Sequence, residues 1–85
     1  MNEPPTIKML RIWDVTSATG LSRSSVWLHV KLLQLPPPVK IGTRAVGWSS
    51  AEIGRINEAR MAGASEDEIK DLVQSMVAGR RRSDS

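Results

Sequence analysis

The chain has 85 residues, of which 40% are hydrophobic and 25% charged, and its 12 Lys and Arg exceed its nine Asp and Glu to give a net charge of +3. This length provides one small hydrophobic core. The absence of cysteine excludes disulfides and thiolate metal sites, and the lone histidine excludes a multi-histidine metal cluster. No apolar run approaches the roughly 20 residues that span a bilayer, so we expect a cytoplasmic protein without a membrane partner.

The charges are distributed unevenly along the chain. Residues 1–50 carry six basic and two acidic side chains, whereas residues 51–79 carry three basic and six acidic ones. A basic half predicts a polyanionic partner, and the acidic half predicts a different role. The alternative is that so small a number of charges is uneven by chance.

After residues 1–8, which we expect to be flexible, the chain predicts two helices joined by a tight turn. The first helix covers residues 13–19 and ends at Gly20, because glycine readily adopts the left-handed conformation that stops a helix. Ser22 is a good N-cap for the second helix, over residues 22–33. Two helices joined by a short turn that contains glycine are typical of a helix-turn-helix.

The middle of the chain predicts a β-hairpin. Three prolines at residues 36–38 end the second helix, because each ring fixes its own backbone and removes a hydrogen-bond donor. Residues 39–41 and 45–48 are two short apolar runs on either side of a glycine-containing link. An isolated hairpin of this length is not stable, so it must pack against the helices, with Trp48 in the core.

Two capping boxes open the last two predicted helices. Ser49-x-x-Glu52 begins a helix over residues 50–62, and Ser65-x-x-Glu68 begins an amphipathic helix over residues 65–78, which Gly79 ends.

The predicted fold class is therefore mainly α with a small β-hairpin: a winged helix-turn-helix followed by an extra C-terminal amphipathic helix. We expect a flexible N-terminus over residues 1–8, a DNA-binding domain over 9–62, a C-terminal helix over 63–79 that packs on the domain or oligomerises, and a flexible basic tail over 80–85.

No arrangement of residues predicts catalysis. No serine stands at a recognisable spacing from the histidine and a carboxylate, and the chain has no glycine-rich phosphate loop. Helix capping and hydrogen bonds to DNA phosphates explain Ser22, Ser24 and Ser25 better than a nucleophile does. We expect a protein that is not an enzyme and that uses no cofactor, metal or small-molecule ligand.

Three motifs carry a resemblance to a known family. They are residues 20–27 (GLSRSSVW), Pro36 with residues 38–42 (PVKIG), and residues 44–48 (RAVGW). With them, residues 10–60 resemble the AlpA-type family of phage and mobile-element regulators, relatives of the MerR-like and excisionase winged helices. The resemblance implies a bacterial protein that binds double-stranded DNA and acts as a transcriptional regulator, as an excisionase (a recombination directionality factor) with an integrase as a candidate partner, or as both.

The resemblance also implies which residues contact DNA. It places residues 22–33 in the major groove, where Arg23 is the first choice for a base contact because a guanidinium pairs bidentately with guanine. Trp27 either donates to a phosphate or is a partly buried packing residue. The candidate DNA contacts are Ser22, Arg23, Ser24, Ser25, Trp27, Lys31, and, in the wing, Lys40, Thr43 and Arg44.

Leu28 and His29 depart from the family pattern, which tends to have a basic or polar residue at the first position and an apolar one at the second. Leu28, Leu32 and Leu35 would then form an apolar line. Either the helix is slightly rotated, with His29 at the edge of the core, or Leu28 and Leu32 meet a neighbouring molecule.

Self-association on DNA is therefore expected, with several copies binding cooperatively. The candidate contacts between copies are Leu28, Leu32, Ile69 and Leu72. The alternative function is a winged-helix protein-interaction adaptor, antitoxin-like or an assembly subunit, that does not touch DNA.

Overall fold

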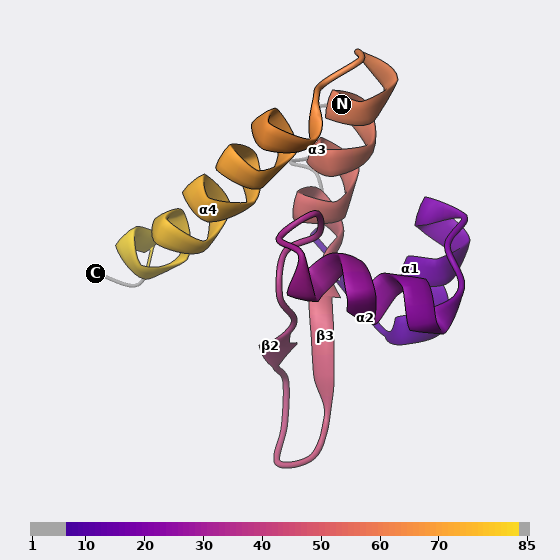
Figure 1. The fold of residues 1–85 in the computed structure, drawn as a ribbon. Helices are drawn as coiled ribbons and strands as arrows, with labels where there is room; N and C mark the ends of the chain where they lie inside the picture. The colour runs from indigo at the N-terminus through magenta and orange to yellow at the C-terminus, as the bar shows by residue number, and fades with distance from the viewer. Residues whose placement is uncertain (1–6, 84–85) are drawn as a thin grey trace, which may run out of the picture.

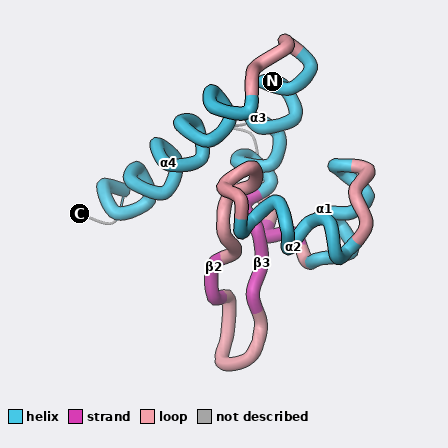
Figure 2. Tube along the Cα trace, in the orientation of Figure 1, coloured by secondary structure: helices cyan, strands magenta, loops and turns pink. Residues whose placement is uncertain are grey.

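The computed structural model describes the backbone of residues 7–83 and the side chains of residues 7–80. The elements follow in the order β1 (Met9–Leu10), α1 (Ile12–Thr19), α2 (Arg23–Lys31), β2 (Val39–Lys40), β3 (Val46–Ser49), α3 (Ser50–Met61) and α4 (Glu66–Ser83) (Figure 1). The three strands form one small antiparallel sheet in the order β1-β3-β2, and the β2–β3 hairpin projects away from the four helices (Figure 2). This confirms the predicted winged helix-turn-helix with an added C-terminal helix.

The turn between α1 and α2 forms as the sequence predicts. Gly20 adopts a left-handed conformation, with φ of 77°, and its N–H donates to the carbonyl of Thr16 over 2.8 Å. Ser22 then caps α2, because its Oγ accepts a hydrogen bond from the backbone N–H of Ser25 over 3.2 Å. The observed start of each helix lies one residue from the predicted start, and Gly20 ends α1 where expected.

The end of α2 comes earlier than predicted. The helix ends at Lys31, and Leu33 takes the left-handed conformation, with φ of 62°, that glycine usually provides. The two residues after Leu33 stabilise this turn, because the N–H groups of Gln34 and Leu35 both donate to the carbonyl of His29. The chain therefore turns sharply and buries Leu35 in the core, so the predicted apolar line that includes Leu35 is wrong.

The sheet contains a strand that the sequence did not predict. β1 pairs with β3, which places Leu10 opposite Trp48, and β2 pairs with the other edge of β3. Lys8 is also held, because its N–H donates to Ser50 Oγ and its carbonyl accepts from Ser50 N–H, both over 2.8 Å. The predicted flexibility is thus wrong at Lys8, and residues 1–6 lie outside the described part of the chain.

Gly47 explains why β1 can approach so closely. A Cβ atom at Gly47 would lie 3.0 Å from the carbonyl oxygen of Leu10, inside normal contact distance. Glycine therefore suits this position, because a side chain here would force the backbone of β1 to move by a few tenths of an ångström.

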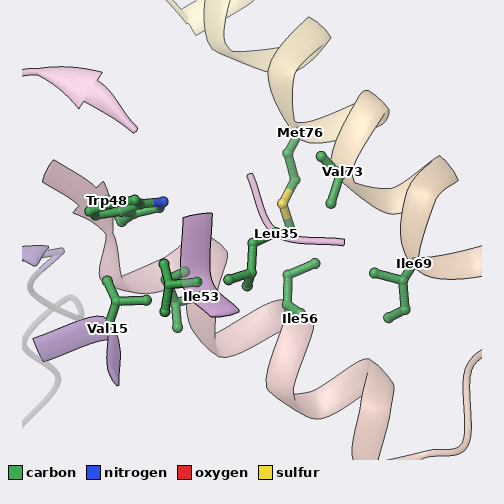
Figure 3. Packing of buried hydrophobic residues seen from close by; sticks show 9 residues of the cluster. Val15, Leu35, Trp48, Ile53, Ile56, Ile69, Val73 and Met76 are labelled. Atoms are coloured by element: carbon green, nitrogen blue, oxygen red, sulfur yellow. The ribbon is translucent and has the colours of Figure 1, made fainter. Parts of the chain in front are cut away.

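The core joins the helix-turn-helix to the C-terminal helix. Trp48 is fully buried, as predicted, and its indole N–H donates to the carbonyl of Pro36 over 2.9 Å. Side chains of α4 point towards α3 and Leu35 in the same cluster (Figure 3). The buried residues are Val15, Val26, Leu35, Trp48, Ile53, Ile56, Ile69, Val73 and Met76. The C-terminal helix therefore packs on its own domain.

The far end of α4 also differs from the prediction. Gly79 does not stop the helix, which continues to Ser83. Arg80 lies within it, and its guanidinium pairs with the carboxylate of Glu52 over 2.6 Å and donates to the carbonyl of Pro37 over 2.8 Å. The prediction of a flexible tail is therefore wrong at Arg80, whose charge ties α4 to α3, while residues 84–85 lie outside the described part.

The capping box at the start of α4 predicts an acid-sensitive helix. The N–H of Ser65 donates to Glu68 Oε1 over 2.8 Å, and the N–H of Glu68 donates to Ser65 Oγ over 3.2 Å. Two hydrogen bonds with Ser65 hold the pKa of Glu68 below its usual range. The one to the Ser65 backbone has the larger effect, and the one to its side chain has the smaller effect. A carboxylate with a lowered pKa stabilises the folded state above its unfolded pKa, and that contribution is lost as the pH falls through the folded value.

We therefore expect the Glu68→Gln variant to lose part of the acid sensitivity of the melting temperature. The difference between wild type and variant should be constant near neutral pH and shrink below about pH 4.5, where an ordinary glutamate protonates. Thermal melts followed by circular dichroism across this range measure it. A difference that does not change with pH would contradict the role of the Glu68 charge.

Candidate nucleic-acid interface

The N-terminus of α2 presents the serine-rich motif. Ser22 and Ser25 bond to each other through their hydroxyls over 3.0 Å, in addition to the capping hydrogen bond. Ser24 and Arg23 are exposed beside them, whereas Ser25 is half-buried. Since helix N-termini attract anions, this end of α2 suits a phosphate, and the Ser22 hydroxyl also has a structural role as the cap.

Arg23 lies over an aromatic ring that the sequence analysis did not identify as part of the site. Its guanidinium carbon is 4.9 Å from the ring centroid of Trp13, which stands in the first turn of α1. The Trp13 side chain is 63% exposed. One feature of the sequence could have identified Trp13 as a surface residue. It directly precedes Asp14, on a helix whose buried position is Val15.

Trp27 is both exposed and packed. Its ring centroid is 5.2 Å from that of Trp48 at an interplanar angle of 57°, and 44% of Trp27 remains exposed. The contact with a core residue favours the packing alternative for the inner side of the ring. The outer side remains accessible on α2.

His29 lies half-buried at the edge of the core. Its Nδ1 is 2.7 Å from the carbonyl oxygen of Ser25, and because a carbonyl only accepts, Nδ1 carries the hydrogen.

The side chains of Leu28 and Leu32 are exposed by 51% and 54%. Leu28 of α2 and Leu32 just after its end are therefore exposed apolar residues, whereas Leu35 is buried.

The wing carries the second group of candidate contacts. Lys40, Thr43 and Arg44 are all exposed on the β2–β3 hairpin, which the hydrogen bond from the N–H of Ile41 to the carbonyl of Ala45 closes over 2.9 Å. Figure 1 shows the hairpin extending from a base beside α2. One structural unit thus presents a helix and a projecting loop that both carry basic side chains.

The basic side chains of this surface form no salt bridge with the described residues. Among the side chains of residues 7–80 the one salt bridge joins Arg80 to Glu52. The four cations of α2 and the wing, Arg23, Lys31, Lys40 and Arg44, therefore have no carboxylate partner in this part of the chain. Three acidic residues lie together in the first turn of α4, at Glu66, Asp67 and Glu68.

Two of the four candidate contacts between copies face the surface and two do not. Leu28 and Leu32 are exposed, whereas Ile69 has no exposed surface and Leu72 is partly buried against the core. Ile69 cannot reach a second molecule while α4 packs on α3, so its assignment as a contact between copies is wrong.

The described residues provide neither a metal site nor a membrane-spanning helix. The residues that the structure describes contain no group of three or more His, Cys, Asp or Glu side chains that could hold a metal ion. None of the helices in this part of the chain has the length and apolar character needed to cross a membrane.

Comparison with known proteins identifies the family. The family model described as prophage CP4-57 regulatory protein (AlpA) matches residues 8–60. The chain belongs to the AlpA family. The AlpA match covers the sheet and α1, α2 and nearly all of α3, and it ends before α4.

One relative of the chain is a phage protein. The chain is 32% identical over 56 residues to an uncharacterized protein, ORF88, of Enterobacteria phage P4. This alignment covers 66% of the chain and 64% of the phage protein, so it spans less than two thirds of that relative. No solved structure matches the chain.

Proposed function

We propose that this AlpA-family protein binds double-stranded DNA in a sequence-specific manner and regulates a phage or other mobile element. It would act as an excisionase, that is a recombination directionality factor, as a transcriptional regulator, or as both. The observation that carries the proposal is the set of four cations on α2 and the wing that have no carboxylate partner among the described residues. The chain would be a binding protein rather than an enzyme.

The two basic elements would contact different parts of the duplex. The N-terminal half of α2 enters the major groove, where Arg23 reads a guanine and Ser22, Ser24 and Ser25 hydrogen-bond to phosphates or base edges. Lys31 and the outer edge of Trp27 contact the backbone. Lys40, Thr43 and Arg44 place the wing on a phosphate or in the minor groove.

The salt dependence of binding tests the proposal. Four neutralised phosphates predict that the logarithm of the association constant falls with the logarithm of salt concentration with a slope of about −3 to −4. Gel shifts with sheared genomic DNA at low salt detect binding, and fluorescence anisotropy with a labelled duplex measures the slope. The Lys31→Ala, Arg44→Ala double variant should reduce its magnitude by about two.

The Lys70→Ala variant is the matched control, because it removes an exposed cation from α4. Its slope should equal that of the wild type. Absence of a shifted band at micromolar protein and low salt would instead favour the protein-interaction adaptor, for which the exposed Leu28 and Leu32 and the acidic start of α4 are the supporting observations.

Cooperative binding of several copies is part of the same proposal. A single module of this kind buries only about 600–1,000 Å² on DNA, so additional contacts between copies would strengthen site occupancy. Leu28 on α2 and Leu32 directly after the helix are exposed aliphatic residues that suit such a contact. In a bacterial cytoplasm the protein would then be nucleoid-associated, with an integrase as a further partner if it acts in excision.

The Leu28→Asp variant should keep its fold and its affinity for a single site but lose cooperativity on adjacent sites. Its position is half exposed, so the substitution leaves the core intact. Footprinting titrations on a duplex with one site measure the affinity for a single site. The same titrations on a duplex with two sites measure the cooperativity. Undiminished cooperativity in a folded Leu28→Asp protein would refute the assignment of this contact.

A further inference from the structure

We infer that Trp13 is a positioning residue: its ring fixes the guanidinium of Arg23 for reading a base and so determines the sequence preference of the protein. This inference rests on the proposed function, since it concerns how a DNA contact is made. It starts from the 4.9 Å separation between the guanidinium carbon of Arg23 and the ring centroid of Trp13.

Both partners of this contact stand on fixed backbone. Trp13 lies in the first turn of α1, where the carboxylate of Asp14 accepts from the N–H of Arg11 over 3.0 Å and the hydroxyl of Thr16 donates to the Trp13 carbonyl over 2.7 Å. Arg23 follows directly after Ser22, the N-cap residue of α2. Because the backbone is held at both residues, the contact with the ring sets the direction of the Arg23 side chain.

The chemistry of the pair suits recognition of a base. An arginine loses considerable rotamer freedom when it binds, and a ring that already holds it reduces that loss. A cation over an aromatic face is attracted by the negative charge of that face. The contact with the ring is made at the guanidinium carbon of Arg23, and the N–H groups around that carbon are the donors that pair bidentately with guanine.

Among the described residues, neither an ion pair of Arg23 nor burial of Trp13 accounts for this contact. Arg23 has no carboxylate partner there, since the one salt bridge belongs to Arg80 and Glu52. Trp13 is 63% exposed and is not part of the buried core cluster, so packing does not account for an exposed tryptophan at this position. The ring and the guanidinium together form an exposed contact between α1 and the start of α2.

Selection from a randomised duplex library tests the inference. The proteins compared are the wild type, Arg23→Ala, Trp13→Leu, Trp13→Phe and, as the matched control for loss of an exposed apolar side chain, Met61→Ala, whose position is 87% exposed. Arg23→Ala identifies the base positions that Arg23 reads. Thermal melts establish that each variant folds, which the exposure of Trp13 leads us to expect.

Trp13→Leu should weaken the preference at those same base positions by about two- to fivefold, the range for an exposed cation–π contact, and leave the other positions unchanged. Trp13→Phe retains a ring and should restore most of the preference, and Met61→Ala should match the wild type. Unchanged preference in Trp13→Leu, or an even loss at all positions, would overturn the inference.

Failure of the inference is distinguishable from failure of the proposed function. If the wild type enriches no sequence, the proposed function fails and the role of Trp13 fails with it. If the wild type enriches a site but Arg23→Ala has the same preference, DNA recognition stands and the role of Trp13 is refuted.

Discussion

Replacing Ile69 by alanine is expected to lower the free energy of unfolding by about 2–5 kcal/mol, the usual cost of truncating a large buried aliphatic side chain. Ile69 has no exposed surface and lies in the same cluster as Ile53 and Ile56 of α3 (Figure 3). Removing its outer carbons leaves a cavity between α3 and α4. Urea denaturation followed by circular dichroism measures the loss.

The Leu28→Ala variant is the control for this experiment, because it truncates an aliphatic side chain that is half exposed. Its effect should stay within about 0.5 kcal/mol, as for most surface positions. If Ile69→Ala instead kept its stability and only dissociated an oligomer, α4 would pack on a neighbouring molecule rather than on its own domain.

Replacing Arg80 by alanine is expected to cost about 1–2 kcal/mol of stability, a value reduced from that of a fully buried charged hydrogen bond because the pair is partly open to water. The substitution removes the ion pair with Glu52 and the hydrogen bond to the carbonyl of Pro37. The carboxylate of Glu52 then loses its partner while remaining mostly buried. Thermal melts and urea titrations both detect this loss.

Arg80→Lys should recover only part of that stability, since lysine retains the charge without the planar fork that reaches both acceptors. The salt slope of DNA binding should be the same for Arg80→Ala and wild type, because the charge of Arg80 is already used within the protein. A reduced slope at unchanged stability would support the role in a free basic tail that the sequence alone predicts.

Local signals predicted most of the fold. Gly20 and Ser22 stop and start helices by interactions with their own neighbours in the chain, so their effect is readable without any tertiary structure. The same holds for the capping box of Ser65 and Glu68. These signals, together with the proline triplet, sufficed for the helix-turn-helix, the hairpin and the final helix.

Features that depend on distant contacts were not predictable in this way. β1 is only two residues long, and the absence of a side chain at Gly47 lets its backbone lie close to β3. Leu33 adopts a conformation that its side chain disfavours, and the burial of Leu35 depends on that turn. Gly79 fails as a stop because helical contacts beyond it, including those of Arg80, extend α4.

The candidate site shows the same division. The family resemblance identified the basic residues on α2 and the wing, and the structure places them on exposed surface without carboxylate partners in the described residues. Neither the ring contact of Trp13 with Arg23 nor that of Trp27 with Trp48 could be predicted, because each depends on how two elements cross in space.

The tilted contact between Trp27 and Trp48 gives the protein an intrinsic optical reporter. Two indoles whose centroids are 5.2 Å apart couple their ultraviolet transitions, and the circular dichroism of such a pair depends on the angle between the rings. One ring belongs to the helix proposed to enter the groove, and the other is anchored to the interior by its bond to Pro36. A small tilt of that helix on binding would therefore register in the near-ultraviolet spectrum without any attached dye.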